Sequence, residues 1–444
     1  MKSSGVIDHP FRRPYTSRLG VLPGTTNAWL DGLRQGGKAA LDKGLPGPKE
    51  ESWRYTPMRS LVKVPFIPAA AANDVDVTEV PSSVPFIEGA LRVVLVNGIF
   101  RQDLSDVSFG EGVSVCDMNS VLTSSDFSTW KILGSLALPD TSPLAALNTA
   151  HMADGVAVSV SKNVRSHKAL HIISVGASGA EPVAFHPRFI FVAAPGSSLK
   201  VIESHVGLPG QPYFSNPVIE IAVGEKAEVR RYVNVSEDDD AFHLATTVVS
   251  VAKSGVFEAF HLGLGGGLVR QDIKVDFSGE DASAHVNGAY ALNGKAHHDF
   301  TTFMDHSVPS CTSDQVFKGV VDGKSHGVYQ GRIVVARGAQ KTDARQLHKA
   351  LFLSRGSQID CKPELEIYAD DVQCAHGAAT GEIDTHQLFY LISRGIDHDT
   401  ARKLLVEGFL TEVVEQIKDN DVRNLFASDI GSWLKRRDIW SAKV

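Results

Sequence analysis

A thiol and an imidazole lie two residues apart near the C-terminus, at Cys374 and His376, just after the strand-like run 363–371. In an extended segment, residues i and i+2 project from the same face, so this sulfur and this nitrogen can reach one small volume. Such a pair suits a soft metal ion or an iron–sulfur species. These two residues are therefore the first candidates for a binding role.

Three neighbours bear on that chemistry. Asp370 and Asp371 offer carboxylates that would orient the imidazole of His376 or keep it protonated. Gly377 has no side chain and leaves room for another group to approach closely.

Two glycine-rich stretches look like nucleotide-binding motifs but fail on spacing. Residues 319–325 end in Gly-Lys-Ser, yet the glycine that a phosphate loop needs five positions before Gly323 is Lys318. Residues 263–267 have Leu268 where the dinucleotide fingerprint needs its third glycine. We therefore expect no nucleotide site here, and we expect the second stretch to let neighbouring chain segments approach closely.

His297, His298 and His306 lie near enough in sequence to indicate a metal cluster. Adjacent residues on a strand point to opposite faces, so His297 and His298 cannot share one ion unless the chain turns there. Structural histidines are the preferred interpretation, and metal ligands are the alternative.

The four cysteines, Cys116, Cys311, Cys361 and Cys374, are few and scattered, which argues against a disulfide framework and favours a reducing compartment. No Cys-x-x-Cys occurs, so the sequence encodes neither a zinc knuckle nor a ferredoxin-type cage. Any iron–sulfur species would be held transiently or together with a partner. For Cys311 and Cys361 we expect buried structural thiols.

The composition is that of an ordinary globular protein. Its 444 residues predict two or three structural units, with 43% hydrophobic and 21% charged residues. The net charge of -7 and the lack of a basic run argue against nucleic-acid binding. No apolar stretch approaches the roughly 18 residues that span a bilayer, and no apolar signal segment follows Met1 and Lys2. We expect a cytoplasmic protein.

Basic residues near the start point faintly to a second location. Arg12, Arg13 and Arg18 have few acidic neighbours, as in an organellar transit peptide, but Pro10 and Pro14 interrupt the amphipathic helix that such a peptide needs. An organellar stroma is therefore the alternative if the source is eukaryotic.

The sequence pattern divides the chain into three parts. Residues 1–85 contain helical pieces broken by Pro and Gly, and the aromatic pair Trp53 and Tyr55 is expected to dock on the body of the protein. Residues 86–383 show β-branched runs with little helical periodicity, and several turns recur at about 25 to 30 residues. This period favours a β-helix of stacked rungs over a sandwich. Helical periodicity returns in residues 384–444, which we expect to form a C-terminal helical domain.

Three helices are expected in that last part. Asp384 and Asp397 are the expected N-caps of the first two, and the first ends at Gly395. In the second helix one stripe is expected to contain Ala401, Leu404, Leu405, Gly408, Phe409 and Glu412. A third segment spans 422–440, and its apolar residues can serve either the chain's own core or a partner interface.

Several motifs together resemble the SufB/SufD family of the SufBCD iron–sulfur cluster assembly complex, and its SufD-type members in particular. They are Glu51-Ser-Trp-Arg-Tyr-Thr-Pro57, Val96-Asn-Gly98, His306 with Pro309, Pro363-Glu-Leu-Glu-Ile-Tyr-Ala-Asp-Asp371, Cys374-Ala-His-Gly-Ala378, Leu388-Phe-Tyr390 and Ser393-Arg-Gly-Ile396. The resemblance covers most of the chain and is densest over 270–409. It implies a mainly β fold, with a right-handed parallel β-helix core flanked by N-terminal and C-terminal helical regions.

The resemblance also implies a scaffold that catalyses no reaction of its own. It implies pairing with SufB through the β-helix and binding of the ATPase SufC through the C-terminal helical domain, so that nucleotide belongs to the partner. His376 matches the family's histidine at the interface with SufB, where a transient iron–sulfur cluster is built, and Cys374 matches its neighbouring cysteine. The pattern Cys-x-His-Gly is SufD-like, and the thiolate that accepts sulfur would come from SufB.

Two alternatives stay open. A β-helix also carries polysaccharide lyases and hydrolases, although the clustered acid/base groups that these need, and a secretion signal, are not visible in the sequence. A SufB-like role, or a homodimer formed through the same β-helix edge, is equally compatible with the sequence.

Overall fold

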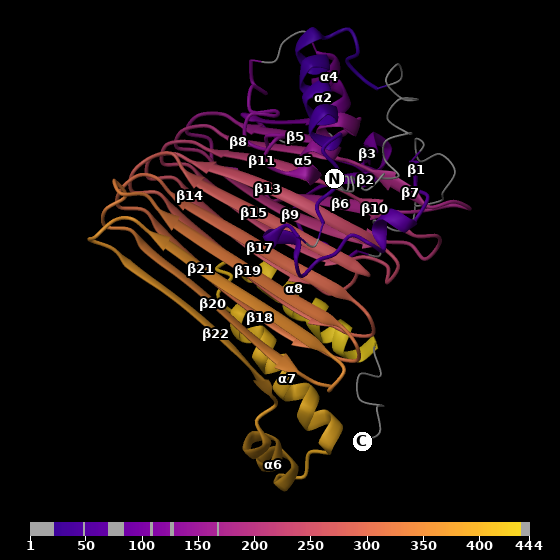
Figure 1. The fold of residues 1–444 in the computed structure, drawn as a ribbon, viewed down its shortest axis with the longest axis vertical. Coiled ribbons are helices and arrows are strands. Elements are labelled where there is room, and N and C mark those ends of the chain that lie inside the picture. The colour runs from indigo at the N-terminus through magenta and orange to yellow at the C-terminus, as the bar shows by residue number, and fades with distance from the viewer. Residues whose placement is uncertain are drawn as a thin grey trace, which may run out of the picture.

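The computed structural model describes residues 22–47, 49–69, 84–106, 110–124, 128–166 and 168–436. The basic segment with its possible transit peptide lies outside these ranges. The core is a long coil in which the chain passes back and forth between two sheets of stacked strands (Figure 1). The prediction of a parallel β-helix is confirmed.

The two sheets contain successive strands of the chain in alternation. The first sheet consists, in spatial order, of β21 (Gln358–Ile367), β19 (His326–Val335), β17 (His297–His306), β15 (Leu268–Phe277), β13 (Phe242–Val251), β11 (Val218–Val223), β8 (Arg188–Ala193), β5 (Gly155–Val160) and β4 (Val113–Asp117). The second consists of β22 (Gln373–Glu382), β20 (Asp343–Phe352), β18 (Thr312–Val321), β16 (Ser283–Leu292), β14 (Val256–Gly263), β12 (Glu228–Ser236), β9 (Ser198–Gly207), β6 (Leu170–Gly176), β2 (Leu91–Val96) and β3 (Ile99–Phe100). Three short strands, β1 (Ile67–Pro68), β7 (Val183–Phe185) and β10 (Tyr213–Ser215), pair beside the first sheet.

The register between rungs matches the repeat seen in the sequence. Glu228 pairs with Val256, which is 28 residues further on, and Val256 pairs with Ser283, 27 residues further on. Ser283 in turn pairs with Thr312 after 29 residues. One full turn of the coil therefore takes nearly the same length of chain each time, which keeps equivalent side chains stacked.

The turns between the strands stack as well. Lys226, Ser254 and Ser310 have left-handed backbones, with φ of 55°, 53° and 59°. Such a conformation costs a non-glycine residue of order 1 kcal/mol or more. The Ser254 N–H donates to the Glu280 carbonyl of the next turn at 2.9 Å, and Lys226 makes the same kind of bond at 3.0 Å. The ladder of hydrogen bonds thus continues through the corners and offsets part of that cost.

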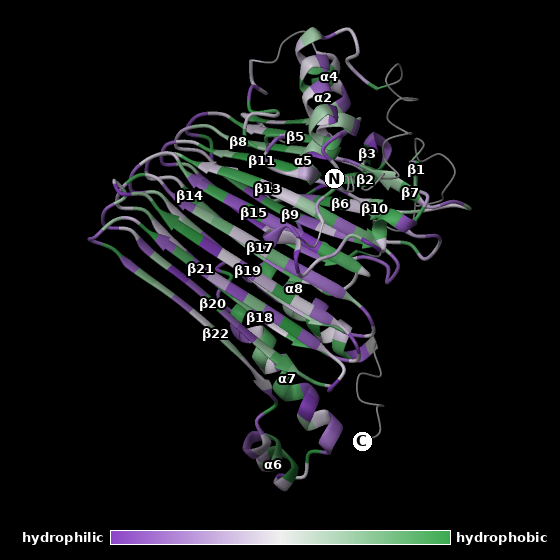
Figure 2. Ribbon diagram, in the orientation of Figure 1, coloured by the Kyte–Doolittle hydropathy of each residue, from purple (hydrophilic) through white to green (hydrophobic). Residues whose placement is uncertain are grey.

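Alternate residues of each strand face the interior of the coil, as a period of two requires. In β14, Phe257 and Ala259 join the interior cluster, whereas Phe260 and Leu262 belong to a cluster on the outer face. Figure 2 shows the resulting mixture of hydrophobic and hydrophilic residues along the strands. Both faces of each sheet are therefore partly covered, the outer ones by helices and the N-terminal segment.

The predicted docking of the aromatic pair is confirmed for Trp53. The segment contains two 3-10 helices, Glu51–Trp53 and Leu61–Lys63. Trp53 is buried, and the guanidinium of Arg270 lies 4.0 Å from its ring centroid. Arg270 also donates to the Ser52 carbonyl at 2.9 Å, so the N-terminal segment is fixed to the outside of the first sheet.

Helices near the start of the coil differ from expectation. Besides α2 (Ala28–Leu41), the structure has α4 (Met118–Thr123) and α5 (Pro143–His151) inside the region that we expected to be almost free of helix. Asn148 of α5 donates to the carbonyls of Pro187 and Asn216 at 2.8 and 2.9 Å. α5 is short and buried over nearly its whole surface, so it has no amphipathic period to reveal it.

The C-terminal helices begin where predicted. They are α6 (Thr385–Ser393), α7 (His398–Val414) and α8 (Asn420–Arg436). Asp384 accepts from the N–H groups of His386 and Gln387, and Asp397 accepts from that of Thr400, so both predicted N-caps are confirmed. None of the helices in the described part of the chain has the length and apolar character that a membrane crossing needs.

The predicted stripe on α7 is largely wrong. Ala401 is buried as expected, but Leu404 is 46% exposed. The residues that pack inward instead are Val406, Leu410, Val413 and Val414. Apolar residues occur on most sides of this helix, so its sequence alone does not determine which side meets the sheet.

The apolar residues of α8 belong to the chain's own core. Phe426 contacts Phe260 of the second sheet, with ring centroids 5.7 Å apart, and Trp433 is buried in the same cluster. Ion pairs of Lys200 with Asp419 and of Lys318 with Glu412 fasten α7 and α8 across the outer face. The choice between core and partner interface is thus settled for α8 in favour of the core.

Buried histidines make the stability of the fold sensitive to acid. Burial lowers the pKa of several histidines, among them His171, His306 and His348 to about 4 and His261 and His298 to about 3. The unfolded chain takes up protons near pH 6.5, so the free energy of unfolding is at its full value above that pH and falls toward pH 4, by up to roughly 1.4 kcal/mol per pH unit for each histidine.

Urea unfolding between pH 7.5 and 5 should show this loss of stability. His306→Gln should flatten the slope and His398→Gln, at an exposed site, should not; a pH-independent midpoint in the wild type would contradict the assignment.

Candidate functional site

Cys374 and His376 lie on β22, the last strand of the second sheet. Cys374 pairs with Ala344 of β20, and His376 pairs with Gln346. Because β22 is extended, the two side chains leave the same face, as predicted. Cys374 packs partly against the interior cluster, whereas His376 is exposed at the end of the coil.

The carboxylates of Asp370 and Asp371 do not contact the imidazole of His376 in the described chain. Asp370 and Asp371 lie in the turn before β22, where the Asp371 N–H donates to Gln340 Oε1 at 2.9 Å. β22 begins only at Gln373, and from there the extended strand leads away from the turn toward His376. Within the described chain neither carboxylate forms a hydrogen bond or ion pair with His376, so the expected orienting role is wrong.

Gly377 meets the expectation of close approach. A Cβ at this position would lie 3.1 Å from Leu347 Cδ1, which is tighter than an ordinary contact. The glycine therefore lets β22 lie flat against β20 beside His376.

Both thiols near this end of the coil are protonated at neutral pH. Burial raises the pKa of Cys374, and it raises the pKa of Cys361, on the facing strand β21, to about 11. A thiolate would therefore form only when a metal ion displaces the proton. The isolated chain offers an exposed imidazole next to a neutral thiol.

The edges of β21 and β22 pair with no other strand of the described chain. Each strand has ten residues. The Gln373 N–H donates inward to Thr342 O, and parallel ladders use alternate residues, so the N–H groups of Cys374, His376 and Ala378 point outward. The candidate ligands thus lie on an open sheet edge with a row of unused backbone donors and acceptors.

The histidine group at 297–306 has structural partners. His297 Nε2 lies 3.0 Å from Thr56 Oγ1, and His306 Nε2 lies 2.9 Å from Ser313 Oγ. The His306 ring also stacks on Phe277. His298 is buried on the interior face, opposite to His297, and in the part of the chain that the structure describes these residues form no group of three ligands. The structural interpretation is the better one.

The glycine-rich stretches also have structural roles. Residues 322–325 form the turn between β18 and β19, and a strand follows where a phosphate loop would need a helix. A Cβ on Gly265 would lie 2.5 Å from the Glu237 carbonyl oxygen, and one on Gly267 would lie 2.3 Å from that of Asp239. The expected close approach of neighbouring rungs is confirmed.

Cys311 is a buried structural thiol, as expected. Its sulfur lies 3.5 Å from the carbonyl oxygens of Gly279 and Pro309, and burial raises its pKa.

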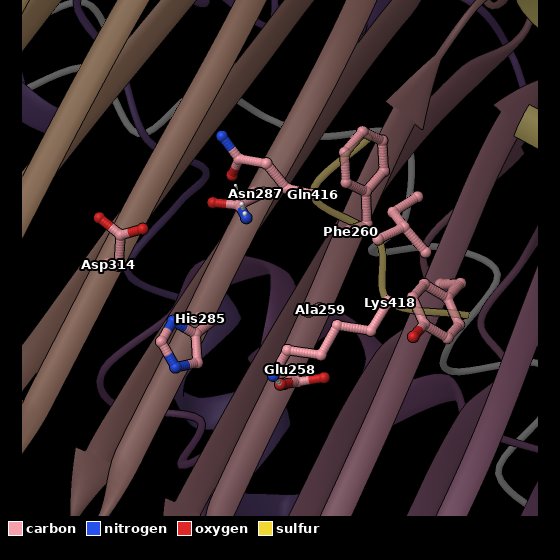
Figure 3. A pocket seen from close by; sticks show the side chains of 10 residues that line it. Glu258, Ala259, Phe260, His285, Asn287, Asp314, Gln416 and Lys418 are labelled. Carbon is pink, nitrogen blue, oxygen red and sulfur yellow. Dashed lines mark hydrogen bonds and ion pairs between the residues drawn. The ribbon is translucent and has the colours of Figure 1, made fainter. Parts of the chain in front are cut away.

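A cavity of about 150 Å³ lies where the link between α7 and α8 crosses the second sheet (Figure 3). Two carboxylates line it, and that of Glu258 is held by Lys418 and, at 3.2 Å, by Arg230. Asn287 donates to Gln416 Oε1 across the same seam at 3.0 Å. A carboxylate engaged by two cations is a poor general acid, so Glu258 gives no support to a polysaccharide-active enzyme.

One convergence of ligand-type side chains is not visible in the sequence. His205 lies on β9, Glu237 follows β12 and His243 lies on β13, and the coil brings one potential ligand atom of each within 4.8 Å of the others. No short motif joins them, because His205 and His243 are 38 residues apart.

Comparison with known proteins agrees with this architecture. The family model for the SufBD protein N-terminal region matches residues 9–172, and that for the SUF system FeS cluster assembly, SufBD core domain, matches residues 174–409. The iron-sulfur cluster assembly protein SufD of Escherichia coli is 30% identical over 398 residues, which cover 89% of this chain and 90% of that protein.

Two further relatives are a SufBD family protein and a chloroplastic protein. An iron-sulfur cluster assembly SufBD family protein of Synechocystis is 28% identical over 406 residues, covering 89% of each chain. The chloroplastic protein ABCI7 of Arabidopsis thaliana is 31% identical over 243 residues, 54% of this chain and 51% of that protein. With both family models matched in order along the chain, and with a SufD protein similar over nine tenths of its length, this chain belongs to the SufBD family of the SUF system for iron–sulfur cluster assembly.

Proposed function

We propose that this chain is a non-catalytic scaffold subunit that pairs, through the open end of its β-helix, with a SufB-type chain and holds a nascent iron–sulfur cluster at the junction. The observation that carries the proposal is the last rung of the coil. There the unpaired edges of β21 and β22 lie beside the exposed imidazole of His376.

Backbone chemistry favours a partner at this edge. Long unpaired strands present N–H and C=O groups that readily accept a further strand, and proteins usually cover or interrupt such edges. Here Ile367 and Tyr368, 40% and 61% exposed, add apolar surface at the end of β21. A chain with the same coil can add its own strands to both sheets, which makes a SufB-type relative a suitable partner.

The ligand inventory favours a shared cluster. Iron–sulfur clusters usually need about four protein ligands, mostly thiolates. This end of the chain offers His376, with Cys374 as a second candidate, and too few other ligands for a cage of its own. The nascent cluster is then a cargo that is built between two chains, with sulfur accepted by thiolates of the SufB-type partner.

The C-terminal helical domain supports a second contact, with an ATPase of the SufC type. No residue of α6 is buried, and Phe389 and Tyr390 are 72% and 57% exposed. In Figure 1, α6 projects beyond the end of the coil. An amphipathic helix with bare aromatic residues fits a partner groove, and nucleotide would stay with that partner.

We also propose a location in the cytoplasm or in an organellar stroma. The similarity to the Escherichia coli protein and to the chloroplastic Arabidopsis protein supports work in the cytoplasm or in an organellar stroma.

His376→Ala should abolish cluster assembly while the complex still forms. The imidazole is exposed and makes no structural hydrogen bond, so its removal should change the unfolding free energy by less than about 0.5 kcal/mol. The test is co-expression with the SufB-type and SufC-type chains of the same organism, co-purification, and anaerobic reconstitution with iron and sulfide. Visible cluster absorption should appear for the wild type and for the matched control Gln373→Ala. Equal absorption in His376→Ala would remove this residue from the proposal.

Ala378→Pro should prevent pairing without unfolding the coil. The Ala378 N–H points outward, so proline removes a donor that only a partner strand would use. We expect at least a tenfold loss of affinity for the SufB-type chain in a binding titration, with unchanged circular dichroism. The control is Lys418→Ala, in the link between α7 and α8, which should pair normally. Unchanged pairing of Ala378→Pro would place the interface elsewhere, and self-association of the wild type without a partner would favour the homodimer.

Replacing Phe389 and Tyr390 together by serine should weaken capture of the ATPase at least tenfold. Both rings are exposed in the chain alone, so the monomer should keep its thermal stability. Pull-down of the SufC-type chain measures the effect, with Leu138→Ser, at an apolar residue that is 46% exposed in the segment before α5, as the control. Full capture by the double variant would contradict a contact through α6.

A further inference from the structure

Three buried ligand-type side chains meet inside the coil, far from its open end. His205, Glu237 and His243 are all buried, and one potential ligand atom of each lies within 4.8 Å of the other two. Their rings and carboxylate come from both sheets and from the turn that joins β12 to β13. Ligand atoms around a tetrahedral zinc ion lie about 3.3 Å apart, so the group needs to contract by at most about 1.5 Å to hold an ion.

Each of the three side chains keeps one polar atom without a partner. His205 Nδ1, His243 Nε2 and Glu237 Oε2 are buried and accept or donate no hydrogen bond. A buried polar atom left unpaired costs about 1 to 3 kcal/mol, so three such atoms within one group of buried side chains indicate that the group lacks a binding partner. A cation held among the three side chains would supply that partner.

The second nitrogen of His205 is held as in known metal sites. His205 Nε2 lies 3.3 Å from Glu203 Oε2. Metal-bound histidines usually donate their second N–H to a carboxylate or carbonyl, which fixes the tautomer and directs the free nitrogen at the ion. Here that arrangement leaves His205 Nδ1 as the free nitrogen. At His243 an ion would take the place of the proton between Nδ1 and Glu237 Oε1, whose 3.2 Å separation is close to the ligand spacing around zinc.

A second layer of buried ion pairs fixes the supporting carboxylate. Arg231 donates to Glu203 Oε1 and Oε2 at 2.6 and 2.8 Å and to Thr247 Oγ1 at 3.1 Å. Glu203 is thereby neutralised by Arg231, and Glu237 supplies the negative charge that faces the two imidazoles. The bidentate pair joins β9 and β12 of the second sheet, and the bond from Arg231 to Thr247 on β13 reaches the first sheet.

An approach from solvent lies next to the group. A cleft of about 540 Å³ on the outer face of the second sheet is lined by Gly207 and Ser236, which adjoin the ligand positions along the chain. Ser204 and Asn234 line the same cleft. An ion would therefore reach the group from this cleft by crossing the second sheet.

We propose that His205, Glu237 and His243 form a binding site for one divalent transition-metal ion, Zn²⁺ or Fe²⁺. Two imidazoles and one carboxylate are a donor set shared by zinc sites and by non-haem iron(II) sites, whereas Mg²⁺ and Ca²⁺ prefer oxygen alone. From β9 to β22 the second sheet takes six steps, β12, β14, β16, β18, β20 and β22, which amount to about 29 Å. The site is therefore separate from His376.

The test is a metal titration of full-length protein that has been freed of metal with a chelator. Zn²⁺ in air, and Fe²⁺ under anaerobic conditions, are each titrated against a chromogenic competitor. We expect one equivalent to bind, and we expect Mg²⁺ not to compete. Glu237→Gln and His243→Gln should each lower the affinity at least tenfold.

Matched variants separate this site from others. His306→Gln, at a buried histidine outside the group, and His376→Ala, at the open end, should both retain the one equivalent. Co²⁺ in place of the native ion should give d–d absorption without a thiolate charge-transfer band, because no cysteine is a ligand. Retention of full affinity in Glu237→Gln and His243→Gln, or loss of the bound equivalent in His376→Ala, would overturn the proposal.

A measurement on the wild type covers the case in which a variant fails to fold. X-ray absorption of the loaded protein should show only nitrogen and oxygen neighbours at about 2.0 to 2.2 Å, with the outer scattering of two imidazoles. A sulfur shell at about 2.3 Å, or failure of the wild type to bind a stoichiometric ion, would overturn the proposal without any variant.

Discussion

In a parallel coil, the backbone hydrogen-bonding groups of every rung except the last find partners in the neighbouring rungs. Each rung takes its hydrogen bonds from the rungs before and after it, and the corner turns continue the same ladder. Such a coil grows without limit in principle and cannot close on itself, so its two ends must be treated differently from its middle. At the N-terminal end, antiparallel pairings of β2 with β3 and of β4 with β5, together with α2, α4 and α5, end the stack. At the other end, the outer edges of β21 and β22 pair with no strand in the described part of the chain.

The lateral faces of the coil depend on segments from both ends of the sequence. Arg188 and Glu220 form a fully buried ion pair on the outside of the first sheet, and Glu220 also accepts from the backbone N–H groups of Gly134, Leu136 and Ala137. One carboxylate thus fixes the covering segment to the sheet. Breaking such a pair usually costs 3 to 5 kcal/mol, because the remaining charge stays buried. On the second sheet, α7 and α8 provide the equivalent cover. The open end is therefore the place where the fold itself supplies no cover.

The features that could be predicted from the sequence are those that depend on a few neighbouring residues. The β-helix followed from turns that recur at one period, and the caps at Asp384 and Asp397 followed from residue type and position, which are properties of a few neighbouring residues. α5 and the buried side of α7 were missed because both depend on tertiary packing. α5 is covered all round, and α7 has apolar residues on several sides, so neither carries a period that points to its neighbours.

The two candidate sites differ in the same way, and the difference bears on what each can hold. Cys374 and His376 are visible in the sequence because a strand of period two brings neighbours together, but the role expected for Asp371 failed because that residue lies in the turn before the strand, where its N–H donates to Gln340. His205 and His243 meet only through the register of the coil, so a sequence reveals neither. An exposed edge allows a ligand to be released when the partner moves, which suits a cargo. A buried group of three side chains, backed by the ion pair of Glu203 with Arg231, suits an ion that stays.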